Sequence, residues 1–86
     1  MSDLNKMWAA LEAYQPIADQ NGHGESWKRM TQERTSEAAD SAQKAAWDTN
    51  AYAACAAMAA MDVVKTEWRI SRAIEHINQA MKEVQP

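Results

Sequence analysis

Four basic side chains recur at helical spacing near the end of the sequence. They are Lys65, Arg69, Arg72 and His76. Spacings of four, three and four residues place all of them on one face of an α-helix. Such a face can hold an acidic protein surface, and we take Lys65, Arg69 and Arg72 as candidate partner-binding residues. The alternative is a solvated face, because the segment 61–84 holds four acids and four bases.

A second candidate contact follows the only glycine-containing stretch. Trp27, Lys28, Arg29 and Met30 are consecutive, and aromatic and arginine side chains dominate the energetic hot spots of protein interfaces. Methionine is also enriched at interfaces, because its flexible side chain adapts to an irregular surface. We therefore predict that Trp27, Arg29 and Met30 contact a protein partner.

The residues that could support catalysis or bind a metal do not form a set. The sequence contains no His-x3-His, Cys-x2-Cys or Glu-x-x-His pair, the usual spacings of metal ligands in helical proteins. Cys55 has no basic residue one helical turn away, so we expect a buried small residue rather than a nucleophile. His23, between two glycines, is expected in a solvated loop, and His76 on the surface. We expect no enzymatic activity, no metal and no cofactor.

Length and composition limit the class of protein. The 86 residues, with 12 acids, 9 bases and a net charge of −3, predict one domain over 1–86. Nucleic acid is not an expected partner, because general affinity for it requires a basic surface. One cysteine excludes an internal disulfide and is typical of a reducing compartment. The stretch 50–64 is too short to span a bilayer, and the N-terminus lacks the pattern of a signal peptide. A cytoplasmic protein without membrane contact is expected.

The elements that must position these residues are all predicted to be helices. No alternating polar and apolar pattern indicates a strand, so the fold class is all-α. A first helix is predicted over 3–15, where Leu4, Met7, Trp8 and Leu11 share a face, and Pro16 ends or kinks it. The segment 19–24 holds both glycines and is predicted to be a loop.

The remainder of the chain has no glycine or proline from residue 25 to residue 85. We predict two long helices, 25–48 and 50–84, that form an antiparallel hairpin. The preferred break is 47–50, where three short polar residues compete for backbone hydrogen bonds. A rival break is 34–37, with Thr35 or Ser36 as the N-cap, and a third possibility is an uninterrupted helix.

The stretch 51–64 is rich in alanine and apolar on every side. A helix of this kind needs cover on two sides, and the protein's own helices are expected to supply one. Small residues let helix axes approach closely, so we predict that a second copy supplies the other. The predicted homodimer seam contains Ala56, Met58, Ala59 and Met61.

These observations predict a small helical module that acts by stoichiometric protein–protein binding. Phage-encoded inhibitors of host defence, anti-CRISPR proteins among them, are often chains of this size without catalytic motifs. That expectation rests on size and on the lack of chemistry. The alternative is a structural or regulatory helical homo-oligomer, or an accessory subunit of a larger assembly.

Overall fold

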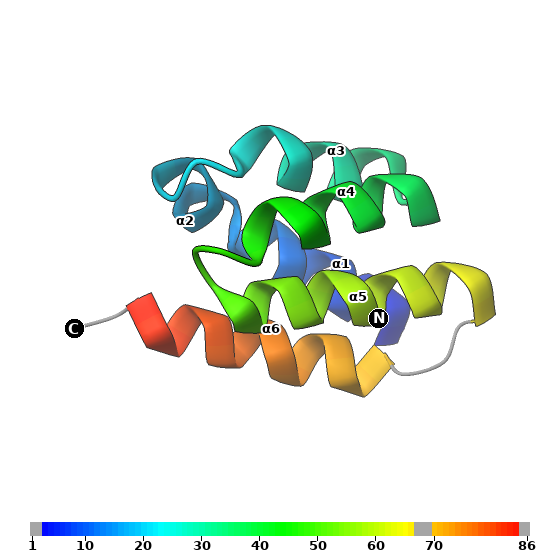
Figure 1. The fold of residues 1–86 in the computed structure, drawn as a ribbon. Helices are drawn as coiled ribbons and strands as arrows, with labels where there is room; N and C mark the ends of the chain where they lie inside the picture. The colour runs from blue at the N-terminus through cyan, green and yellow to red at the C-terminus, as the bar shows by residue number, and fades with distance from the viewer. Residues whose placement is uncertain (1–2, 67–69, 85–86) are drawn as a thin grey trace.

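The computed structural model describes residues 3–66 and 70–84. The described residues form helices and no strand, and 87% of them are helical. These helices are α1 (Asp3–Ala13), α2 (Gln15–Gln20), α3 (Gly24–Glu33), α4 (Ser36–Ala46), α5 (Ala51–Thr66) and α6 (Ile70–Val84), and Figure 1 shows their arrangement. The predicted all-α class is confirmed. The prediction of three helices, with uninterrupted spans 25–48 and 50–84, is wrong.

The span 25–48 is divided at the rival break. Arg34 adopts the left-handed conformation with φ 56°, and its N–H donates to the Met30 carbonyl at 2.9 Å, which ends α3. This geometry is a common way to terminate a helix. Thr35 then caps α4, because its Oγ1 accepts a hydrogen bond from the Ala38 N–H at 3.2 Å.

The preferred break, 47–50, is also present. The N–H groups of Thr49 and Asn50 both donate to the Ala46 carbonyl, at 3.1 and 2.9 Å, and α4 ends there. Asn50 caps α5 through Oδ1, which accepts from the N–H groups of Tyr52 and Ala53. The short polar side chains therefore interrupt the helix as predicted, and α4 and α5 run in opposite directions (Figure 1).

The span 50–84 folds back on itself. Asn50, at the start of α5, donates from Nδ2 to the carbonyl of Ala80, near the end of α6, at 3.2 Å. In Figure 1 the two helices lie side by side and run in opposite directions, and they pack closely. A single helix of that length would leave the apolar faces of its two halves uncovered. In the hairpin, each half covers part of the other.

The N-terminal elements also differ from the predicted boundaries. Helix α1 ends at Ala13, and Pro16 lies in the first turn of α2, where its missing N–H costs no hydrogen bond. The predicted loop 19–24 is reduced to residues 21–23, with Gly22 at φ 89°. Gly24 begins α3, and a Cβ at this position would lie 2.9 Å from the Cα of Asp19, so only glycine fits.

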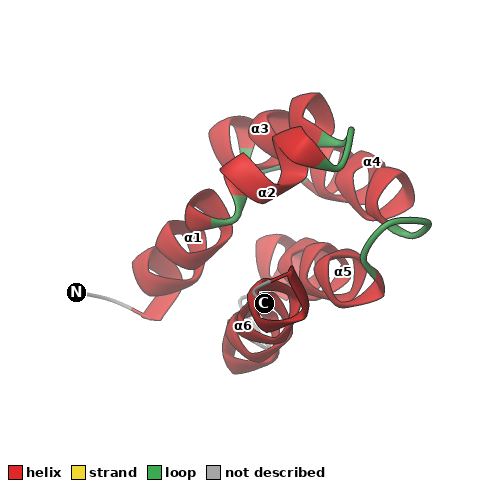
Figure 2. Cartoon of the chain, turned by 90° about the vertical axis from the view of Figure 1, so that its left-hand side faces the viewer, coloured by secondary structure: helices red, strands yellow, loops and turns green. Residues whose placement is uncertain are grey.

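The helices close into a ring around a common core. Helix α3 packs on α4, α4 on α5, α5 on α6, and α6 on α1, which also contacts α3. Figure 2 shows this arrangement nearly along α5 and α6, with α2 beside α3. Within residues 3–66 and 70–84, none of the helices has the length and apolar character needed to cross a membrane.

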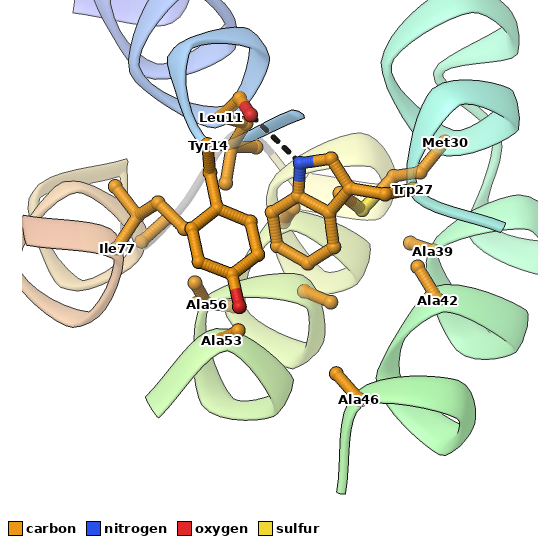
Figure 3. Close-up of a cluster of buried hydrophobic side chains, with 14 of the residues drawn as sticks. Leu11, Tyr14, Trp27, Met30, Ala39, Ala42, Ala46, Ala53, Ala56 and Ile77 are labelled. Atoms are coloured by element: carbon orange, nitrogen blue, oxygen red, sulfur yellow. Dashed lines mark hydrogen bonds between the residues drawn. The ribbon is translucent and has the colours of Figure 1, made fainter. Parts of the chain in front are cut away.

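Large side chains from α1–α3 fill the ring, and alanines line it. Figure 3 shows Trp27 and Tyr14 at the centre, with Ala42 and Ala46 of α4 and Ala53 of α5 facing them. The rings of Tyr14 and Trp27 are 4.7 Å apart. Small residues on α4 and α5 allow these helices to approach each other and the aromatic rings. The alanine-rich helix is therefore covered on several sides by its own chain.

Candidate functional site

Trp27 and Met30 are core residues, so their predicted role as surface contacts is wrong. Both side chains are fully buried, and the Trp27 indole Nε1 donates to the Leu11 carbonyl at 2.7 Å. The side-chain types that make interface hot spots also supply most of the buried area in a small core. The sequence shows the type of residue, and the packing of α3 against α1 and α4 decides which role it takes.

The exposed basic candidates lie on different helices. Arg29 is on the surface of α3, where its Nε donates to Glu33 Oε2 at 2.8 Å. Lys65 is exposed in the last turn of α5, and Arg72 is exposed in α6. Arg69 lies outside the described residues. Because α5 and α6 are separate helices, Lys65 and Arg72 do not belong to one continuous helical row, as the sequence suggested.

The predicted self-association seam is divided between core and surface. Ala56 is fully buried, Ala59 is 7% exposed, and Met61 packs half-buried against the core. Ala56 therefore cannot form a seam with a second copy, because α5 uses it inside the ring. Met58 is 37% exposed and remains available. Self-association itself stays a prediction.

Three of the predicted residues meet at one place. Met58 and Ala59 of α5 and Arg72 of α6 line a groove on the outside of the ring. We call it the hairpin groove; its lining is Cys55, Met58, Ala59, Asp62, Arg72 and His76. Its volume is about 110 Å³, well below the range of roughly 300–1,000 Å³ that holds small-molecule ligands. The size suits a protein side chain.

The hairpin groove combines an apolar floor with a polar rim. Ala59 and Cys55 supply small side chains, and Met58 supplies a flexible thioether that adapts to a partner's shape. Asp62, Arg72 and His76 supply charge and hydrogen-bonding groups around them. An apolar centre inside a polar rim is the usual anatomy of a protein interface.

Cys55 and His76 line this groove from opposite helices, which the sequence analysis did not foresee. They are 21 positions apart, and only the reversal of the chain between α5 and α6 brings them to one groove. In the described part of the chain, no hydrogen bond joins the Cys55 thiol to the His76 imidazole. The predicted surface position of His76 is consistent with its partial exposure.

A buried polar cluster was missed altogether. His23, predicted as solvated, is 3% exposed, so that prediction is wrong. Its Nε2 lies 3.3 Å from Tyr14 Oη and its Nδ1 3.1 Å from Thr49 Oγ1, both in hydrogen bonds. The ring also stacks on Tyr14. His23 thus joins the turn before α3 to the end of α1 and to the loop before α5.

Burial shifts the pKa values of His23 and Tyr14 in the directions that favour their neutral forms. Burial lowers the pKa of His23 below its usual 6.5. Burial raises the pKa of Tyr14 above 10.0, and side-chain hydrogen bonds to Asn21 and Asn50 oppose that shift. Two glycines flanking a histidine gave no signal of this, because the buried surroundings come from distant helices.

Other grooves are larger, and some of their polar side chains are hydrogen-bonded or ion-paired within the chain. A groove of about 420 Å³ between α1 and α3 includes Gln15, whose Nε2 donates to Asp19 Oδ1 and to the Gly24 carbonyl, each at 2.8 Å. An apolar groove of about 250 Å³ is lined by Leu4, Trp8, Arg34, Val63 and Val64. There the Arg34 guanidinium covers Trp8 at 5.1 Å and pairs with Glu12.

No cluster of three or more potential metal ligands occurs among the residues that the structure describes. Comparison of the chain with known protein families, with curated proteins and with solved structures finds no match in any of the three.

Proposed function

We propose that this protein acts by stoichiometric binding of a protein partner, without chemical turnover, through the hairpin groove. The observation that carries the proposal is the position of Met58. Seven side chains of helix α5 are buried, yet Met58 stays 37% exposed beside a groove with a charged rim. A partner's apolar side chain in this groove would remove Met58 from water, which is favourable.

The basic side chains at the rim of the groove favour an acidic partner. Arg72 and His76 lie on the α6 side of the groove, with the exposed Lys65 one helical turn beyond Asp62 on α5. Such charges mainly raise the rate of association with an acidic partner and set its orientation. Binding at the groove should therefore weaken as salt increases, because exposed charges are screened.

Two narrower forms of this function remain proposals. An inhibitor of a host defence complex, of the phage-encoded kind, would act by occupying its target's surface, and its support is the length of the chain and the lack of catalytic motifs. A homo-oligomer or accessory subunit would use the same groove, and its support is the exposed Met58 on a chain of only 86 residues, a size at which self-association often adds stability.

Matched glutamate substitutions at two equally exposed positions test the proposal. Met58, in the hairpin groove, and Val64, in the groove against α1, are 37% and 36% exposed. The complexes formed by each variant are measured by native mass spectrometry of the purified protein and by capture from cell lysate. We expect Met58→Glu to reduce complex formation at least tenfold and Val64→Glu to leave it unchanged.

The reverse result would contradict the proposal and identify the groove at Leu4, Trp8 and Val64 as the binding site. Equal complex formation by both variants and the unmodified protein would contradict it as well. Circular dichroism spectra identical to that of the unmodified protein establish that each variant is folded. Both positions are on the surface, where substitutions change stability little.

A further inference from the structure

We infer that the turn between α2 and α3 is a site of spontaneous covalent modification, at which the Asn21 side-chain amide is converted to a carboxylate. The reactive pair is Asn21 and Gly22, which are adjacent in the sequence. An asparagine reacts in this way when the backbone nitrogen of the next residue can reach its Cγ atom. The inference is independent of the hairpin groove, which lies on other helices.

The reaction needs only water and the atoms of these two residues. The Gly22 nitrogen loses its proton to solvent and bonds to Asn21 Cγ, and the side-chain amide nitrogen leaves as ammonia. Because both groups belong to one chain, the attack is intramolecular and is favoured by proximity. Water then opens the resulting succinimide ring at either of its carbonyl groups, which yields aspartate or isoaspartate. Both products carry one more negative charge than asparagine.

The structure leaves the attacking nitrogen accessible. Gly22 is exposed, and a Cβ atom at this residue would have no neighbour within 4 Å. Its φ of 89° is a conformation that residues with a side chain rarely adopt, so the turn requires glycine here. The lack of a side chain also leaves the Gly22 nitrogen unshielded. Asn21 itself is half-exposed, so solvent reaches both partners.

A single long hydrogen bond holds the attacking nitrogen. The Gly22 N–H donates to the Asp19 carbonyl at 3.4 Å, whereas the N–H groups of the residues on either side donate at 3.0 Å. A distance of 3.4 Å lies beyond the usual range of roughly 2.7–3.2 Å, so this bond is weak. The attack also requires rotation about ψ of Asn21, which is 0° in the structure. Exposed turns open in this way at low cost in free energy.

The other three asparagines lie where this reaction is opposed. Asn5 is in α1 and Asn78 is in α6, and the regular helical backbone keeps the next nitrogen away from the side chain. Asn50 is 9% exposed, and its side chain caps α5 and donates to the Ala80 carbonyl. Glycine follows none of the three. Asn21 is therefore expected to be the site of conversion.

The new carboxylate would act on the buried pair Tyr14 and His23. The Asn21 side chain hydrogen-bonds to Tyr14, whose Oη lies 3.3 Å from His23 Nε2. The phenol has one proton to donate, and a carboxylate accepts it more strongly than a neutral imidazole does. Asp19 and Glu25 line the groove that His23 also lines, so the product adds a third carboxylate there. Negative charge favours the protonated imidazole, and conversion should therefore raise the pKa of His23.

Incubation of the folded protein at pH 6 and pH 8, followed by peptide mapping, tests the inference. Mass spectrometry locates the mass gain that accompanies conversion of an amide to an acid. We expect conversion at Asn21 to be roughly tenfold or more faster than at Asn78, which is exposed and is the internal control. The rate should increase with pH, because the attacking nitrogen has to lose its proton.

A second asparagine–glycine pair separates the effect of the turn from that of the dipeptide. Gln79→Gly creates such a pair at Asn78, inside α6. We expect this helical pair to convert much more slowly than Asn21 in the same molecule. Circular dichroism establishes that the variant is folded. Equal rates at the two pairs would show that the turn does not determine the site, and would overturn the inference.

Two further results would overturn it. One is conversion at Asn21 that is no faster than at Asn78 in the unmodified protein. The other is conversion at Asn21 in urea but not in the folded protein, because the turn would then protect the pair. Asn21→Asp carries the carboxylate of one product and tests the link to the buried pair. Titration of the His23 ring by NMR should give a higher pKa in Asn21→Asp than in the unmodified protein, and an unchanged pKa would contradict that link.

Discussion

The aromatic cluster of Tyr14, His23 and Trp27 and the alanine-rich hairpin of α5 and α6 exclude water in different ways. The aromatic cluster fills space with three rings whose centres are 4.7–6.1 Å apart, and its polar atoms find partners inside the protein. The hairpin leaves little space between its helices, because small side chains let the helices approach closely. Two of its larger side chains, Tyr52 and Met58, remain on the surface, whereas Ile77 is buried.

The difference indicates where the molecule tolerates change. A region filled by large side chains is destabilised when atoms are removed. A region in which helices pack closely is destabilised when atoms are added. One methionine of the hairpin, Met58, lies outside the core, whereas Met61 and Met81 pack against it. Under the proposed function, stability and binding therefore depend on different parts of the fold.

The largest expected effect is the loss of volume in the aromatic cluster. Trp27→Ala removes a fully buried indole and the hydrogen bond to the Leu11 carbonyl, and should cost about 3–5 kcal/mol. Small domains are stable by only about 5–15 kcal/mol, so most of the stability would be lost. Urea denaturation followed by circular dichroism measures the change. Trp47→Ala, at a 44% exposed tryptophan, is the control and should change stability by less than about 0.5 kcal/mol.

Added volume in the hairpin should have the next largest effect. Ala56→Leu places three more carbon atoms where α5 faces the core, and overpacking of this kind costs about 1–3 kcal/mol. The same substitution at the exposed Ala51 provides the control and should be nearly neutral. Equal destabilisation by the two variants in denaturant titrations would show that close approach at Ala56 is not what the hairpin requires.

The Asn50 side chain joins the start of α5 to the last part of α6, and its removal should have a smaller effect. Asn50→Ala removes the cap of α5 and the bond to Ala80, at a cost of about 1–2 kcal/mol. Asn50→Ser keeps a capping oxygen but cannot reach the Ala80 carbonyl, so it should recover part of this loss. Hydrogen exchange of the last turn of α6 separates the two roles: it should be faster in both variants. Unchanged exchange in Asn50→Ser would argue against a role for the Ala80 bond.

The smallest expected effect is a change of stability with pH in the aromatic cluster. Burial lowers the pKa of His23 in the folded protein, so the unfolded chain takes up a proton first as the pH falls below about 6.5. The stabilising contribution of neutral His23 is present above that pH. It is lost as the pH falls through the lowered pKa of the folded state.

The measurement is the free energy of unfolding at several pH values for the unmodified protein and for His23→Gln. The decrease of stability between pH 7 and pH 5 should be smaller in His23→Gln, because the buried imidazole is gone, while His76 and the carboxylates are common to both. The same slope in both proteins would show that His23 does not contribute to the pH dependence.

Local features of the fold were predictable, and so was part of the proposed binding surface. Thr35 as an N-cap and the break at 47–50 follow from short-range hydrogen bonding, and Pro16 at the start of α2 follows from its missing N–H. Met58 and Arg72 were both predicted as contacts, although in two different sites. Their common groove required the reversal between α5 and α6, for which the sequence offered no glycine or proline.

The sequence by itself determined that this chain is helical and that alanine dominates one helix, and it offered 34–37 and 47–50 as alternative positions for a break. These properties depend on residues within about four positions of one another, through helix propensity and capping. Tertiary structure alone decided that Trp27, Met30 and Ala56 face inward, that His23 is buried, and that Cys55 and His76 line one groove. Each of these depends on neighbours far away in the chain, as the bonds from Trp27 to Leu11 and from Asn50 to Ala80 show, because burial is a property of the surroundings rather than of the residue.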